Sequence, residues 1–144
     1  MAGRKQMLGN SRKKKTAKID SLIGENTEIT GDIQFTGGLH IDGMVKGNIF
    51  AEAGSNSVLS LSDQGKIEGE IHVPYNIIDG TVNGNVYSSE HIELEARSRI
   101  TGDVYYNLLE ISGGAQVSGR LVYTPDRADE EPKPADPVID DGYS

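Results

Sequence analysis

The chain has 144 residues and a net charge of −8, with no Cys, no Trp and two Phe. This length allows one domain, and the lack of Cys excludes both a disulfide framework and a thiolate metal site. Gly is abundant, at 18 residues against five Pro, whereas ordinary usage is about 7%. Such a composition favours a fold with many tight corners.

The first segment, residues 1–19, is predicted to be a disordered basic arm. It holds seven Lys or Arg, no acidic residue and no strand or helix periodicity. Anionic lipid attracts each basic residue near its surface by roughly 1 kcal/mol, and small apolar side chains add a second anchor. We expect a membrane arm made of Met1, Arg4, Lys5, Met7, Leu8, Arg12, Lys13, Lys14 and Lys15. Nucleic acid is the competing partner, but the arm has no aromatic residue for base stacking, which favours lipid.

The central segment, residues 20–123, repeats one pattern of strand-forming residues. The motif Ile/Val, any, Gly, any, Ile/Val/Leu occurs eight times, where chance predicts about one occurrence. The occurrences start at Ile29, Ile41, Val45, Ile67, Ile78, Val82, Ile100 and Val117. Alternation with period two indicates strands rather than helices, so each repeat is predicted to be one winding of a β-solenoid with about six windings.

Stacked windings should form interior columns of aliphatic residues paired by parallel ladders. One column is predicted to contain Ile33, Ile49, Ile71, Val86, Val104 and Leu121. A second should contain Ile41, Leu61, Ile78, Leu94 and Ile111. A glycine column should lie at a corner, with 15 to 22 residues between its members Gly31, Gly47, Gly69, Gly84, Gly102 and Gly119.

Two departures from the repeat and one outward column are also interpretable. The long third gap predicts a loop at residues 53–57, and Pro74 should lie at a corner because it cannot donate to a ladder. The residues that follow the first column are expected to face outward, with Phe50, Tyr87 and Tyr105 stacking on one another rather than forming a lateral contact.

The last segment, residues 124–144, is predicted to be a disordered acidic tail. It contains four of the five Pro, and seven acidic residues against two basic ones. An entropic brush is the favoured interpretation, and a docking segment around Val138 or Tyr143 is the alternative.

The sequence lacks the common catalytic and ligand-binding signatures. It contains no phosphate-binding loop and no zinc-protease motif. His40 and His91 are expected at equivalent places about three windings, or roughly 14 Å, apart, which is too far to share a zinc ion. His72 should lie on another face. The acidic residues between interior positions are interpreted as a solvated face. We therefore expect no cofactor, no metal and no catalytic residue.

The two ends of the predicted solenoid show no capping element. Uncapped ends expose unpaired strand edges, and contacts that do not close generate filaments. No apolar run approaches the roughly 18 residues of a membrane span, and no secretory signal follows the basic start. The sequence alone thus predicts a cytoplasmic protein that associates end to end.

Several segments resemble the bactofilin family. The similarity rests on residues 39–49, on residues 67–71 and 100–104, and on the short basic arm and the Pro-rich tail. It covers about residues 20–123. The resemblance implies a right-handed triangular β-helix that forms bacterial cytoskeletal filaments without nucleotide. It also implies a scaffold at the inner face of the cytoplasmic membrane for cell-shape, cell-wall or polarity proteins.

The resemblance further implies where polymer contacts lie. At the N-terminal end they would involve Ile29, Ile33 and Phe35, and at the C-terminal end Val117, Leu121, Val122 and Tyr123. The rival interpretation is a β-solenoid enzyme of the acyltransferase or zinc hydratase type with sites between chains, but such enzymes keep a strict six-residue repeat. A monomeric adhesion module is a third interpretation, and the missing secretion signal argues against it.

Overall fold

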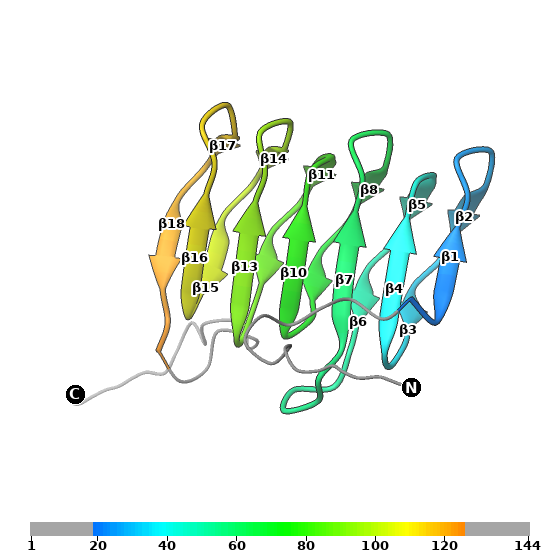
Figure 1. Ribbon diagram of the computed structural model, residues 1–144, viewed down its shortest axis with the longest axis horizontal. Helices are drawn as coiled ribbons and strands as arrows, with labels where there is room; N and C mark the ends of the chain where they lie inside the picture. Colours follow the sequence, from blue (N-terminus) through cyan, green and yellow to red (C-terminus); the bar gives the residue numbers. More distant parts are fainter. Residues whose placement is uncertain (1–18, 126–144) are drawn as a thin grey trace, which may run out of the picture.

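The computed structural model describes residues 19–125, and the predicted arm and tail lie almost wholly outside this range. The described chain contains no helix; its strands form three parallel sheets of six strands each. Each winding contributes one strand to every sheet, so the windings lie side by side along the long axis (Figure 1). The first and last windings form opposite ends. The predicted all-β solenoid of about six windings is confirmed.

The three sheets are named here A, B and C. Sheet A contains β1 (Ser21–Ile23), β4 (Gly38–Ile41), β7 (Val58–Leu61), β10 (Tyr75–Ile78), β13 (His91–Leu94) and β16 (Leu108–Ile111). Sheet B contains β2 (Glu28–Thr30), β5 (Met44–Lys46), β8 (Lys66–Glu68), β11 (Thr81–Asn83), β14 (Arg99–Thr101) and β17 (Gln116–Ser118). Sheet C contains β3 (Ile33–Gln34), β6 (Ile49–Phe50), β9 (Ile71–His72), β12 (Val86–Tyr87), β15 (Val104–Tyr106) and β18 (Leu121–Tyr123).

The core consists of aliphatic columns that run along the axis. Both predicted columns are confirmed, because strand register places their members opposite one another in sheets C and A. Sheet B adds a third column, made of Ile29, Val45, Ile67, Val82, Ile100 and Val117. A fourth column in sheet A includes Leu39, Leu59, Asn76, Ile92 and Leu109. Burial of these side chains is the main driving force for the coil.

The predicted glycine column lies at the corner between sheets B and C. A Cβ atom at Gly47, Gly69 or Gly84 would overlap the carbonyl oxygen of the preceding glycine in the column. Gly69 and Gly84 also have φ values of 153° and 154°, which L side chains rarely adopt. Glycine is therefore required here both by space and by backbone conformation.

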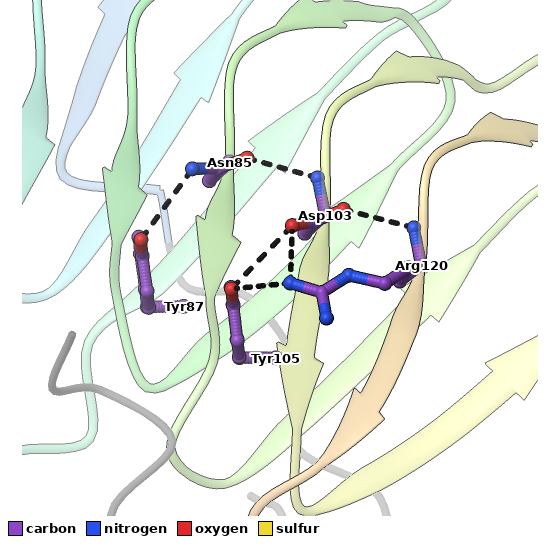
Figure 2. Close-up of polar contacts among 5 residues, drawn as sticks. All are labelled: Asn85, Tyr87, Asp103, Tyr105 and Arg120. Carbon is purple, nitrogen blue, oxygen red and sulfur yellow. Dashed lines mark hydrogen bonds and ion pairs between the residues drawn. The ribbon is translucent and has the colours of Figure 1, made fainter. Parts of the chain in front are cut away.

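Next to this column runs a ladder of polar side chains that the sequence did not reveal. The side-chain oxygen of Asp32 accepts the backbone N–H of Asn48 at 2.9 Å, and Asn48 does the same for Glu70. Asn85 likewise accepts the N–H of Asp103, and Asp103 accepts that of Arg120, both at 2.9 Å, as Figure 2 shows. Some acids that alternation assigns to a solvated face thus satisfy corner amides that would otherwise lack a partner.

Two of the predicted departures are confirmed, and one prediction is wrong. The loop at residues 53–57 lies between β6 and β7, and Pro74 lies at the bend between β9 and β10. His40 and His91 are not equivalent. His40 pairs with Ser60, which pairs with Ile77 of β10, whereas His91 pairs with Tyr75, two positions before Ile77 in that strand. The reason is that each sheet A strand has two inward positions, so adjacency to an aliphatic residue does not define the register.

We predict that Gly84→Ala destabilises the coil by on the order of 3 kcal/mol, because strain at positive φ adds to a backbone overlap. Urea denaturation followed by far-UV circular dichroism measures this effect. Gly113→Ala is the matched control, since a Cβ there meets nothing within 4 Å. Equal stability of the two variants would contradict the proposed role of the column.

Candidate end-contact surfaces

Both ends of the coil present strands that pair on one side only. β1, β2 and β3 form the N-terminal edge of the three sheets, and β16, β17 and β18 form the C-terminal edge. Across the described residues, no helix or additional strand covers either edge. Each end therefore offers a row of backbone donors and acceptors together with the last members of the apolar columns.

The C-terminal end exposes apolar side chains that are fully buried elsewhere in their columns. Ile111 is 49% exposed and Leu121 is 43% exposed, whereas their column neighbours Leu94 and Val104 are 0% exposed. Tyr123 is 60% exposed, and its ring packs against Tyr106 with centroids 5.9 Å apart. Val117 is half-buried. Another surface of matching shape would bury all four side chains.

The N-terminal end is less open. Ile29, Ile33 and Phe35 are half-buried, while Val45 and Ile49, which follow Ile29 and Ile33 in their columns, are fully buried. Leu22 is 61% exposed, but it faces sideways from sheet A. The three residues predicted at this end thus lie together on the terminal winding.

The residues predicted at the C-terminal end divide into two groups. Val117 and Leu121 terminate interior columns and lie on the end surface. Val122 instead pairs with Tyr105 in the outward column of sheet C, so its side chain belongs to the side of the rod. Ile111 and Leu109 also lie on the end surface; Ile111 could have been selected from its column, whereas the column of Leu109 was not recognised in the sequence.

The outward column of sheet C forms an aromatic ladder, as predicted. Phe50 and His72 have ring centroids 5.2 Å apart, His72 and Tyr87 4.4 Å, and Tyr87 and Tyr105 4.7 Å, all in stacked geometry. The rings cover one another, so Tyr87 is 2% exposed and Tyr105 is 7% exposed although both point away from the core. The ladder stabilises successive windings through aromatic contact.

Arg120 terminates the polar ladder at the C-terminal end (Figure 2). Its guanidinium donates to Asp103 Oδ2 at 3.0 Å and reaches the Tyr105 hydroxyl at 3.5 Å. This side-chain hydrogen bond, followed by the backbone bond from Arg120, lowers the pKa of Asp103 below its ordinary value of 3.8. Reciprocally, Asp103 raises the pKa of Arg120. A cation thus lies at the position where Asp32, Asn48, Asn85 and Asp103 accept the amide of the next winding.

The histidines do not assemble a ligand set. His40 lies 3.1 Å from the Ser60 hydroxyl and 3.0 Å from Asp42 Oδ1, and His72 lies 3.1 Å from Glu70 Oε1. Between residues 19 and 125, no three His, Asp or Glu side chains come together as metal ligands would. In the same range, no helix has the length and apolarity needed to cross a membrane.

We predict that Arg120→Gln raises the pKa of Asp103, because the charged hydrogen bond that favours the carboxylate is lost. Carboxyl ¹³C NMR titration measures this shift. The pairing strengthens the last winding at pH values above about 4 and is lost as the pH falls through the lowered pKa of Asp103. Arg99→Gln serves as control, and an unchanged Asp103 titration in Arg120→Gln would contradict the assignment.

Comparison with known proteins identifies the family of this chain. The family model described as "Bactofilin: Polymer-forming cytoskeletal" matches residues 21–122. The chain is similar to bactofilin BacO of Myxococcus xanthus (strain DK1622), at 30% identity over 106 residues that cover 74% of this chain and 81% of BacO. It is also similar to bactofilin BacP of that organism, at 27% identity over 132 residues that cover 92% of this chain and half of BacP. No solved structure matches significantly. The chain belongs to the bactofilins, a polymer-forming cytoskeletal family.

Proposed function

We propose that this bactofilin assembles end to end into cytoskeletal filaments without nucleotide. The observation that carries the proposal is the exposure of Ile111 and Leu121 at the C-terminal end, because the same columns are dry inside the coil. Fully burying an aliphatic side chain contributes about 1.5–3 kcal/mol, so covering a half-exposed one contributes roughly half of that. Ladder hydrogen bonds at the joined edges would add to this gain.

In this proposal, the first winding of one chain contacts the last winding of the next. Ile29, Ile33 and Phe35 form the N-terminal surface, and Val117, Leu121 and Tyr123 form the C-terminal one, with Val122 at its margin. Because apolar burial and strand pairing suffice, no hydrolysis step is needed to drive assembly. Structural rather than catalytic activity fits the cytoskeletal family to which the chain belongs.

The proposal also assigns the flanking segments. Residues 20–123 are the polymerisation domain, residues 1–19 are a basic arm that binds the inner face of the cytoplasmic membrane, and residues 124–144 are an acidic tail. The solenoid between them carries fifteen acidic and five basic residues, so the arm, rather than the rod, is the part attracted to anionic lipid. A filament presents many arms to the membrane at once, so weak binding by each arm adds up to stable attachment of the filament. Such a filament would position cell-shape, cell-wall or polarity proteins.

The first test is filament formation by the purified chain at micromolar concentration without ATP or GTP, observed by negative-stain microscopy and sedimentation. We expect Leu121→Arg to abolish filaments, because the Arg charge would be buried at the contact between two chains. Far-UV circular dichroism should stay unchanged, because the same charge is exposed to solvent in the single chain. Asn83→Arg is the matched control, as Asn83 is exposed in the middle of sheet B. A monomeric parent chain at high concentration would refute end-to-end assembly.

The membrane assignment predicts that deleting residues 1–18 abolishes pelleting with anionic liposomes. The physical reason is that seven basic residues leave with the arm, each worth about 1 kcal/mol near such a surface. Deleting residues 126–144 is the control and should leave pelleting intact. If the arm-deleted chain still pelleted with the liposomes, the membrane contact would have to lie elsewhere.

A further inference from the structure

The outer face of sheet A differs in charge from the other two faces. Glu93 and Glu110 lie opposite each other in adjacent strands β13 and β16, and both side chains point outward. Glu90 precedes β13, and Asp42 follows β4. None of the six strands of this sheet contains Lys or Arg. The outward carboxylates in the strands of this sheet are therefore those of Glu93 and Glu110, on its last two strands, whereas Asp42 is paired with His40 at 3.0 Å.

The other outward surfaces have their charges balanced or have few. On sheet B, Lys46 pairs with Glu28 at 3.2 Å, and Lys66 pairs with Glu68 at 3.4 Å. Sheet C presents the aromatic ladder. At the corner between sheets A and B, Arg97 is engaged by Asp63 at 3.1 Å and Asp79 at 3.2 Å. The closest basic group to Glu110 is His91, whose Nε2 is 3.8 Å away.

The sheet A face also combines this charge with apolar surface. Leu22 and Leu108 are 61% and 60% exposed at its two ends, and Ile77 is half-buried between them. Tyr75 in the same face has a raised pKa, first through burial and then through the negative charge of Glu90. A segment rich in Lys and Arg suits this mixed surface. The aliphatic part of each side chain covers apolar atoms, while its charged group contacts a carboxylate.

The basic arm joins the solenoid at this face. Asp20, the residue before β1, is held in place because its N–H donates to the Gly38 carbonyl and its carboxylate accepts the Gly38 N–H, both at 2.9 Å. Residues 12–15, the Arg-Lys-Lys-Lys segment, lie four to seven positions before Ile19. At about 3.3–3.6 Å per residue, they reach roughly 13–25 Å from it.

This reach matches the position of the carboxylates. β13 and β16 are the fifth and sixth strands of sheet A, counted from β1. At a strand spacing of about 4.8 Å they lie roughly 19 and 24 Å from β1. A fully extended arm that runs across the sheet, along the rod axis, therefore brings Lys13 to the level of Glu93 and Arg12 to the level of Glu110, with residues 14–15 over the preceding strand.

We propose that the sheet A face is a docking surface for the chain's own basic arm, with Arg12 and Lys13 lying over Glu110 and Glu93 and residues 14–15 beside them. The docked arm keeps its cations away from lipid. The same four cations cannot contact the carboxylates and a bilayer at once, so the acidic face and the membrane compete for the arm. This competition rests on the proposed membrane attachment, whereas docking itself does not.

Docking is tested by disulfide formation within the full-length chain, which has no cysteine of its own. Thr16→Cys is combined with Ile77→Cys, three windings along sheet A, or with Asn83→Cys, in the same winding but on sheet B. Mild oxidation followed by denaturing electrophoresis should show an intramolecular disulfide at least about fivefold faster for the Ile77 pair. Equal rates, or disulfides between chains only, would overturn the proposal.

The role of charge is tested by Glu93→Gln with Glu110→Gln in the Ile77 pair. Loss of two exposed charge contacts should slow disulfide formation about threefold to tenfold. The matched control is Glu25→Gln with Glu52→Gln, which removes the same charge at exposed corner positions and should leave the rate unchanged. If both double variants slowed the reaction equally, a site on sheet A would be refuted.

The competition is tested separately with anionic liposomes and the chain without added cysteines. Glu93→Gln with Glu110→Gln should increase pelleting about threefold over the Glu25 and Glu52 control, because the arm is released. Equal pelleting of the two variants would refute competition. Absence of pelleting for every chain would refute membrane attachment and leave the disulfide result, and hence docking, standing.

Discussion

Registered stacking of one winding on the next is the constraint on which the rest of the molecule depends. Every strand pairs with its equivalent in the neighbouring winding, so the side chain at an interior position packs against the side chain at the equivalent position one winding on. The glycine column shows how narrow the tolerance is, because the carbonyl of Gly69 occupies the place where a Cβ of Gly84 would be. Aliphatic columns, corner glycines and the Asn and Asp bonds to corner amides all serve this same registration.

In a coil built in this way, each end exposes the residues that would be buried between two windings elsewhere in the coil. Leu121 at the end occupies the same column as Val104 and Val86, yet 43% of it remains exposed. The interactions that hold windings together are therefore available at the ends without any additional device. This explains physically why a small repeat protein belongs to a polymer-forming family, and why the choice of end residues is constrained by the columns.

The sequence predicted the interior better than the exterior. Alternation with Gly at a nearly fixed distance identified two columns, because the members of those two columns are apolar in every winding. It could not place His40 relative to His91, since sheet A has two inward positions per strand and the corner lengths vary. The polar ladder escaped prediction for another reason: an Asp, Asn or Glu follows each of the first five column glycines, but alternation assigns this position to solvent and does not show that its side chain bonds to a backbone amide one winding away.

In the proposed end-to-end assembly, the sides of the rod favour growth along the axis over sheet-like aggregation. Each face handles its outward positions differently: sheet B pairs opposite charges, sheet C stacks aromatic rings on one another, and sheet A carries the adjacent carboxylates of Glu93 and Glu110 with no Lys or Arg in its strands. Two sheet A faces repel each other, and the rings of sheet C are already covered by their neighbours. Among the residues that the structure describes, only the ends combine uncovered apolar columns with unpaired strand edges, so the proposed association has one favourable direction. Sheet A, whose carboxylates disfavour contact with another sheet A, is then the face suited to a cationic segment.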